Sequence, residues 1–446
     1  MNGLQINVAE KGSDFVGLNI TSETRCATFP MGYAIVPGDD VDITPSLRSE
    51  ILLLIRKISD CEKLQGERVC RINKNDLHHD FPIGSILFLI EDFLNRGSYY
   101  TEKEKVLGKG LPGKISWNST IKKIKPIVSE RGIAFWDFIV HKSRIKHDRL
   151  ITELHKYCVY KSFELLGFLY TPALPEQGLI NEADVKKNKG YYVRFLDSKI
   201  SETHLEQNAE LFVHMKNVIQ NFDSEDTISS ATYGTSTFHT VWESMVDQVY
   251  GSVKQSEIDK YYPRSIWKKP NGEKMKNNAP LRPDTIMFGK DDNGAECCFI
   301  LDSKYYSFAA MKKDGIDESE ENAQLSVAAY GSIPGTDSIQ KQITYAEFID
   351  KSKTPHKNGC PAKYKFDSDK IFNAFILPGN VDNESGIEYI GYAEADWNTQ
   401  ATENYRKIHG FLLDTRTVMQ KHVSLSDVRQ TLAGCILREI SNLPQQ

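Results

Sequence analysis

The sequence predicts a mixed α/β fold in two parts, a mainly helical first part and a second part in which strands alternate with helices. Three observations predict it. The first 170 residues hold three long patterns of helical period, two strand-like apolar runs flank an Asn293-Gly294 turn, and further strand-like runs alternate with helical ones towards the C-terminus. A chain of 446 residues is also long enough for two domains.

The predicted first domain, residues 1–170, takes its helices from three amphipathic segments. These are "SLRSEILLLIRKISD", "IGSILFLIEDFLNRG" and "DRLITELHKYCVYKSFELLGFLY". Gly97 directly follows the second pattern, where a helix commonly ends. Residues 171–224 are predicted to connect the domains and to contain one more helix, over 202–222.

The predicted second domain, residues 225–446, opens with a helix over residues 236–251. Four apolar side chains at helical spacing form one stripe on it: Phe238, Trp242, Met245 and Val249. Strand-like runs follow, namely "DTIMF", "CCFIL", "KIFNAFILP" and "EYIGYAEADW". Helical patterns recur over residues 339–351 and near the C-terminus. Strands mixed with helices predict an α/β domain.

Composition argues against several classes of protein. No apolar run approaches the length needed to span a bilayer, and the N-terminus lacks a basic segment followed by an apolar one, so we expect neither a membrane nor a secreted protein. The eight cysteines contain no CxxC pair, which favours reduced thiols over a disulfide framework or a zinc knuckle. We therefore expect a cytoplasmic protein.

Basic residues are concentrated in two stretches, although the net charge is −5. Residues 101–150 hold twelve Lys or Arg against five acidic residues, and "RSIWKKPNGEKMK" begins at Arg264. Local positive potential attracts phosphates, so both stretches are candidates for DNA binding; a solvated surface is the alternative. The candidate DNA-binding residues are Lys114, Trp117, Asn118, Lys122, Lys123, Lys125, Lys268 and Lys269. Trp117 could equally anchor the core of its domain.

The Asn293-Gly294 pair predicts a β-hairpin whose opposed residues have numbers that sum to about 586. Asp284 and Asp302 meet this condition and are expected to face each other on neighbouring strands. Because side chains alternate along a strand, Lys304 shares a side with Asp302, and Ser303 points away. The hairpin thus predicts two carboxylates and one ammonium group at the end of a mostly buried sheet.

Two opposed carboxylates repel each other, and burial increases the cost. Lys304 can neutralise one charge, whereas a divalent cation can neutralise both, and Mg²⁺ prefers carboxylates together with retained water. Such an ion beside a phosphate would activate water for in-line attack, with Lys304 positioning or deprotonating that water or offsetting phosphate charge. A structural ion pair is the alternative reading of the same residues.

Pro283-Asp284 followed by Asp302-Ser303-Lys304 resembles the motif of the PD-(D/E)xK nuclease superfamily, with Asp where Glu is more usual. The resemblance implies a nuclease domain with a central mixed sheet flanked by helices. It implies catalytic roles for Asp284, Asp302 and Lys304, with Glu243 of "VWESMVDQVYG" as a further acid. Asp284, Asp302, Glu243 and Ser303 are the candidate metal ligands. A solvent-exposed glutamate is the alternative for Glu243.

Five segments together resemble the LlaJI-type family of restriction endonucleases, from about residue 80 to the C-terminus: "GKGLPGKISWNSTIKKIKPIV", "ILDSKYY", "IPGTDSIQKQITYAEF", "FNAFILP" and "IGYAEADW". This resemblance implies a bacterial type II enzyme that cuts double-stranded DNA with Mg²⁺, at a short asymmetric site (GACGC for the family's namesake). It also implies a cognate methyltransferase. Gln342 lies in a segment resembling the active-site helix of such nucleases. An asymmetric target further suggests a monomer or a dimer formed transiently during cleavage.

Three alternatives remain at this point. The chain could be the nuclease subunit of a McrBC-like system, with a separate NTPase as partner, because it has no phosphate-binding loop of its own. It could be a DNA-binding subunit with a degenerate catalytic site. It could also be a structural protein with an incidental ion pair, which predicts no salt-dependent DNA affinity.

Overall fold

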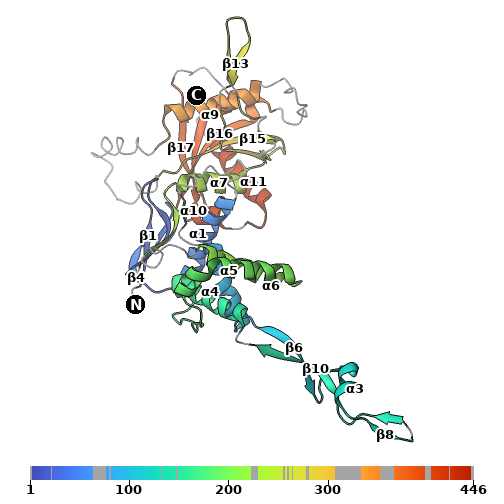
Figure 1. Cartoon of the computed structure of the whole chain (residues 1–446). Helices are drawn as coiled ribbons and strands as arrows, with labels where there is room; N and C mark the ends of the chain where they lie inside the picture. Colours follow the sequence, from blue (N-terminus) through green and yellow to red (C-terminus); the bar gives the residue numbers. More distant parts are fainter. Residues whose placement is uncertain are drawn as a thin grey trace. The chain divides into compact units, whose positions relative to one another are not determined.

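The computed structural model describes residues 3–21, 23–63, 77–79, 82–130, 132–146, 149–221, 230–254, 257–258, 261–263, 265–277, 281–306, 333–351, 366–396, 403–420 and 422–442. The chain divides into two compact units (Figure 1). The sheet unit comprises Met1–His79 and Thr232–Gln446, and the helical unit comprises Asp80–Ala231.

A five-stranded mixed sheet lies at the centre of the sheet unit, in the order β14-β15-β16-β18-β17. Its strands are β14 (Thr285–Lys290), β15 (Glu296–Ser303), β16 (Ile371–Gly379), β17 (Ile387–Glu394) and β18 (Lys407–Asp414). β15, β16 and β18 run parallel, and the two outer strands are antiparallel to their neighbours. β16 is buried at all nine positions, as expected for a parallel strand covered on both faces.

Helices cover both faces of this sheet (Figure 1). They include α7 (Phe238–Tyr250), α9 (Thr336–Lys351), α10 (Thr415–Met419) and α11 (Leu425–Ser441). On one face, Tyr345 and Ile349 of α9 share a core cluster with Ile300 of β15. On the other, Ala433 of α11 packs closely on Gly289 of β14. α7 packs against α11 and β14, and its predicted apolar stripe is buried.

The N-terminal segment belongs to a second sheet, in the order β4-β1-β3-β2-β11-β5. Its strands are β1 (Leu4–Val8), β2 (Val16–Thr21), β3 (Arg25–Phe29), β4 (Gly38–Val41), β5 (Leu77–His79) and β11 (Ser230–Thr235), and α1 (Pro45–Lys63) follows β4. The prediction of a mainly helical domain over residues 1–170 is therefore wrong for this segment. These strands have only three to six residues each, which is too short a run of alternating apolar and polar residues to be recognised in the sequence.

The helical unit consists of a helical part and a smaller β part. Its longer helices are α2 (Ile83–Arg96), α4 (Leu150–Leu166), α5 (Glu182–Glu202) and α6 (Glu206–Asn221). Because α6 packs against α2, α4 and α5, residues 182–221 belong to this unit and do not form a connecting region. The predicted boundaries at residues 170 and 225 thus differ from the structure, since periodicity locates helices but not their packing partners.

The β part of the helical unit spans residues 102–146, which we call the basic arm. It contains β6 (Glu102–Lys109), β7 (Lys114–Ile115), α3 (Trp117–Lys123), β8 (Ile127–Ser129), β9 (Gly132–Ala134) and β10 (Ile139–Lys146). β10 pairs with β6 along its full length and with β7, and β8 pairs with β9. In the sheet unit, a separate hairpin joins β12 (Ile266–Lys268) to β13 (Lys274–Asn277).

The other predicted helices and strands are confirmed. Gly97 ends α2 in the left-handed conformation, with φ of 64°, and its N–H bonds the carbonyl of Phe93. The prediction of reduced thiols holds for five of the described cysteines but not for Cys61, which is disulfide-bonded. The absence of a CxxC pair does not exclude a disulfide between cysteines that lie further apart in the sequence. Among the described residues, no helix combines the length and apolarity needed to cross a membrane.

Candidate active site

The β14–β15 hairpin has the predicted register. Thr285 pairs with Leu301, and every other pair along the two strands keeps the same sum of residue numbers. The turn is closed by bonds from Asp291 N–H to the Ala295 carbonyl and from Gly294 N–H to the Asp291 carbonyl, with Gly294 at φ of 79°. Asp284 therefore lies opposite Asp302 at the open end of the hairpin.

Short polar contacts hold the two carboxylates and Lys304 together. The backbone N–H of Ser303 donates to Asp284 Oδ2 over 2.9 Å. Lys304 Nζ lies 2.5 Å from Asp302 Oδ2, and its side chain is 20% exposed. Lys304 also continues the β15–β16 ladder, because its N–H donates to the Ile376 carbonyl. The structure thus brings Asp284, Asp302 and Lys304 into one cluster.

This cluster is electrostatically strained. Burial raises the pKa of Asp284 well above its usual range, and the charges of Asp302 and Glu243 raise it further. Burial also raises the pKa of Asp302, and the ammonium of Lys304 offsets this only in part. The pKa of Lys304 is raised despite burial, because Asp302 and Asp284 favour its charged form. One positive charge therefore does not balance the acidic groups around it.

Gln342 of α9 lies fully buried beside this cluster. Its amide lowers the pKa of Asp302, although neither its nitrogen nor its oxygen has a hydrogen bond of good geometry within the described residues. Asn373 of β16, also fully buried, donates to the Gln342 and Tyr405 carbonyls and so attaches α9 to the sheet. Gln342 was predicted on a helix over the active site; the structure places it beside the two carboxylates, and its role stays a prediction. Asn373 was not predicted, although an amide within the apolar run "IFNAFILP" was a signal for it.

The remaining predicted site residues have weaker support. Glu243 acts on Asp284 through its charge, but the described residues contain no group of three His, Cys, Asp or Glu side chains arranged to hold a metal ion. Ser303 contributes its backbone N–H to the cluster, and its hydroxyl is buried without a hydrogen bond to any described residue. Their roles as metal ligands stay predictions.

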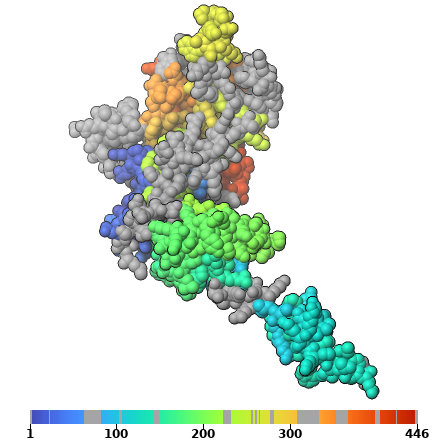
Figure 2. All heavy atoms as spheres, in the orientation of Figure 1, coloured from blue at the N-terminus to red at the C-terminus, as the bar shows by residue number. Residues whose placement is uncertain are grey.

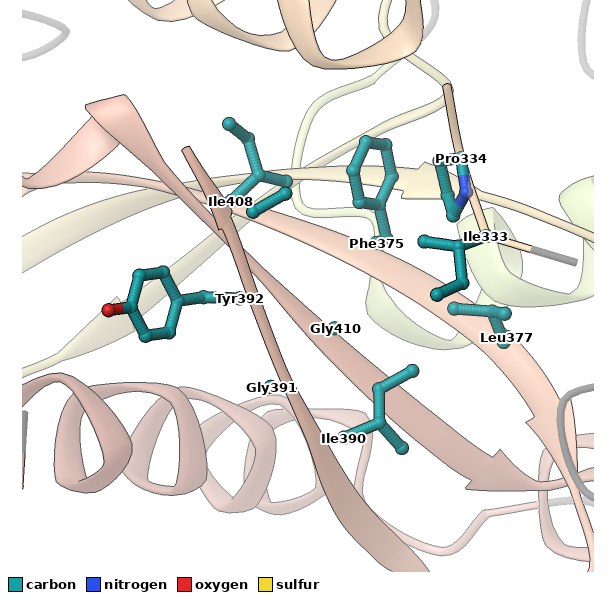
Figure 3. Close-up of a pocket in the computed structure, with 10 residues that line it drawn as sticks. Ile333, Pro334, Phe375, Leu377, Ile390, Gly391, Tyr392, Ile408 and Gly410 are labelled. Carbon is teal, nitrogen blue, oxygen red and sulfur yellow. The ribbon is translucent and has the colours of Figure 1, made fainter. Parts of the chain in front are cut away.

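An apolar pocket of about 110 Å³ lies on the same sheet, over strands β16, β18 and β17 (Figure 3). Asp302 pairs with Phe375 of β16, which pairs with Gly410 of β18, which in turn pairs with Gly391 of β17. Figure 3 shows Phe375 beside Ile333 and Pro334, with no side chain on the two glycines. The pocket is lined by Ile333, Pro334, Phe375, Leu377, Ile390, Gly391, Tyr392, Ala393, Ile408 and Gly410. On the side of β16, Asp302 therefore has the apolar side chain of Phe375 as its neighbour, which is consistent with the burial that raises the pKa of Asp302.

The basic residues predicted to bind DNA lie outside this cluster and are exposed. Lys114, Trp117, Asn118, Lys122, Lys123 and Lys125 lie on β7, on α3 or just after it, and the basic arm is drawn in cyan and teal in Figure 2. Trp117 is 54% exposed while its ring packs edge-on against Phe138, so it is only partly an anchor. Lys268 and Lys269 lie on or beside β12, where Lys269 pairs with Glu273 at 3.0 Å.

The basic arm also exposes many apolar side chains. Trp136 is 87% exposed, and Val128 and Ile133 of the β8–β9 hairpin are 73% and 68% exposed. Exposed aromatic groups next to lysines are typical of surfaces that meet a macromolecule. Sequence patterns did not identify Trp136, because a single aromatic residue in a loop has no period.

Comparison with known proteins identifies one family. The profile of the LlaJI restriction endonuclease family matches residues 15–397, beginning earlier than the resemblance found in the sequence. The "Type II restriction enzyme BsuMI component YdjA" of Bacillus subtilis (strain 168) is 26% identical over 302 residues. This alignment covers 64% of the present chain and only 57% of that relative.

Two solved assemblies from Thermococcus gammatolerans are distantly similar. The half-complex of McrB AAA+ hexamers with bound McrC gives a TM-score of 0.31 at 11% identity, covering 94% of this chain and 82% of the other. The McrBC complex gives 0.21 at 13% identity, covering 53% and 65%. Such scores carry no argument about fold or function. The family profile, in contrast, spans most of the sequence, and the chain belongs to the LlaJI restriction endonuclease family.

Proposed function

We propose that this chain is the Mg²⁺-dependent nuclease of a bacterial restriction–modification system and that it hydrolyses phosphodiester bonds in double-stranded DNA. One observation carries the proposal. Asp284 and Asp302 face each other across a hairpin register, at the buried end of a sheet, with Lys304 2.5 Å from one of them. Membership of a restriction endonuclease family makes a nuclease the expected use of this cluster.

The donor set fits a magnesium ion. Two carboxylates with raised pKa values gain from a cation between them, and the ion prefers such oxygen ligands with several waters retained. Asp284 and Asp302 would hold the ion, with Glu243 and Ser303 as further candidates. A bound ion would supply Lewis-acid stabilisation of the phosphate and a more acidic water.

The residues of the chain itself do the positioning. The Ser303 N–H fixes one carboxylate, and Asp302 orients the Lys304 ammonium. Lys304 offsets negative charge on the phosphate or holds the attacking water. The buried sheet and the apolar surface of Phe375 limit competing solvation. The expected products carry 5′-phosphate and 3′-hydroxyl ends.

DNA contact is assigned to the two exposed basic surfaces. Lys114, Trp117, Asn118, Lys122, Lys123 and Lys125 of the basic arm would contact the backbone or bases, as would Lys268 and Lys269 of the β12–β13 hairpin. Exposed lysines bind phosphates and release counterions, which makes binding strongly dependent on salt. A methyltransferase of the same system would protect the target, and a transient dimer would cut the two strands.

A second form of the proposal includes a partner subunit. The curated relative is named as a component of a type II restriction enzyme, and the chain matches only 57% of it. We therefore include a form in which this chain cuts DNA only when another subunit, such as an NTPase, is present. The chemistry at Asp284, Asp302 and Lys304 is the same in both forms.

The test is incubation of the purified protein with a sequenced plasmid and Mg²⁺, with and without co-expressed neighbouring subunits and nucleotide. Run-off sequencing of the ends reports the target and the cut positions. Cleavage by the chain alone supports an autonomous type II enzyme, and cleavage only with a partner supports the subunit form. Cleavage that survives in the Asp302→Ala variant would place the catalytic site elsewhere.

A further inference from the structure

The segment of chain directly after Lys304 is attached to the N-terminal part of the sheet unit. Tyr305 is 6% exposed, and its hydroxyl accepts a hydrogen bond of 2.9 Å from the backbone N–H of Met31. These residues are 274 positions apart in the sequence. The Tyr305 ring also packs on Phe238, the first residue of α7, with a centroid distance of 5.5 Å.

Met31 belongs to a tight turn, Pro30–Tyr33, that lies against the ends of the central strands. Thr415, which follows β18, donates from its hydroxyl to the Met31 carbonyl over 3.0 Å. Gly32 has φ of 68°, and a Cβ atom placed on it would lie 2.6 Å from the backbone nitrogen of Gly379, the last residue of β16. The turn therefore contacts the carboxyl ends of two neighbouring strands, and any side chain on Gly32 would displace it.

The far side of this turn is also fixed. The Tyr33 hydroxyl donates to Glu50 of α1. Glu50 also pairs with Arg416 of α10, and the Arg416 Nε lies 3.1 Å from the Glu50 carboxylate. The Tyr33 ring packs against Phe29 with centroids 4.8 Å apart. The Pro30–Tyr33 turn is thus held on both sides and can act as a rigid support.

Lys304 lies between these contacts and Asp302. Its N–H donates to the Ile376 carbonyl over 2.8 Å, and Trp242 Nε1 approaches the same carbonyl at 3.4 Å. The next residue, Tyr305, leaves the strand and reaches the turn. The path of the backbone at Lys304 is therefore set on one side by the sheet and on the other by Tyr305.

We propose that Tyr305 is a positioning residue for Lys304, and that the N-terminal Pro30–Tyr33 turn is part of the catalytic apparatus through this hydrogen bond. The inference rests on the proposed function of Lys304 and extends it to a segment that the catalytic motif does not include. Removing the hydroxyl leaves the ring in place but frees the chain after Lys304 to move, and small displacements of a catalytic group cost activity steeply.

The test compares Tyr305→Phe with Tyr99→Phe, which removes a tyrosine-to-carbonyl hydrogen bond in the helical unit. Single-turnover cleavage at saturating DNA and Mg²⁺, well below the melting temperature, is expected to fall about tenfold for Tyr305→Phe and less than twofold for Tyr99→Phe. DNA affinity should stay within about twofold for both. A rate equal to wild type for Tyr305→Phe, or a lower rate explained by weaker DNA binding, would overturn the inference.

A second readout does not need cleavage, so it separates this inference from the proposed function. Modification of the Lys304 amine by a small amine-reactive reagent, followed by mass spectrometry, measures how firmly the ammonium is held against Asp302. We expect faster modification in Tyr305→Phe, and also in Gly32→Ala, which shifts the turn without touching Tyr305. Unchanged modification in both variants would refute the positioning role, whether or not wild-type protein cuts DNA.

Discussion

Two regions of this chain, the β14–β15 hairpin and the basic arm, carry lysines in opposite environments. Lys304, the residue directly after β15, is 20% exposed and is paired with Asp302. It lies next to Asp284, a carboxylate whose pKa is raised. In the basic arm, Lys122 and Lys123 are exposed on a short helix. Charges at the β14–β15 hairpin interact at low effective dielectric and are suited to stabilising a transition state. Charges on the basic arm are screened by salt and are suited to attracting DNA.

If this division is correct, the largest effect is on cleavage by variants of the buried hairpin. Asp302→Ala and Lys304→Ala are each expected to lower the single-turnover rate about a thousandfold or more, with DNA affinity changed by less than about threefold. The matched control is Asp292→Ala, an exposed acid on the turn of the same hairpin. Retained cleavage in the first two variants would place the catalytic site outside this cluster.

Metal binding gives the next largest effect. An ion that binds the folded state at 100 times its Kd raises the unfolding free energy by about 2.7 kcal/mol. We expect Ca²⁺ or Mg²⁺ to stabilise the wild-type protein in urea denaturation and not to stabilise Asp302→Asn. Equal stabilisation of both proteins would show that the ion binds elsewhere.

The pH dependence of stability follows from Asp284. Because its pKa is raised on folding, the native state holds this proton more tightly than the unfolded chain does. Stability without metal should therefore fall as the pH rises from about 4, the ordinary pKa of aspartate, through the raised value. Asp284→Asn should show a smaller fall, because Asp302 also has a raised pKa, and should be more stable than wild type at pH 7.5 in EDTA. Urea denaturation at several pH values measures it, and a variant less stable at every pH would contradict it.

The β14–β15 hairpin was predictable because the information that specifies it is local in the sequence. A glycine turn fixes the register, and a period of two then places Asp284, Asp302 and Lys304 together. The contact of Asn373 with α9, and that of Tyr305 with Met31, join residues 31 and 274 positions apart, and no local pattern encodes them. The N-terminal strands were missed for a related reason, since β1 and β3 are adjacent and parallel but separated in sequence by β2.

Variants of the basic arm test the other half of the comparison. Each phosphate contact contributes about 0.9 to the slope of log affinity against log salt concentration. The double variant Lys122→Ala and Lys123→Ala should lower that slope by about 2 and leave the cleavage rate at saturating DNA unchanged. The control is the pair Lys186→Ala and Lys187→Ala, on the exposed side of α5. Identical slopes for the two double variants would show that Lys122 and Lys123 of the arm do not contact DNA.

The smallest expected effect distinguishes two neighbouring lysines on the β12–β13 hairpin. Lys269 lies 3.0 Å from Glu273, whereas no carboxylate is paired with Lys268 in the ion pairs of the described residues. Such an exposed pair adds little to stability, but it partly neutralises the charge that a phosphate would meet. Lys268→Ala should therefore lower the salt slope by about 0.9, and Lys269→Ala should lower it less. Glu273→Gln should strengthen DNA binding slightly, because it releases Lys269. If both lysine variants leave the slope unchanged, this hairpin carries a solvated surface and the DNA contacts belong to the arm.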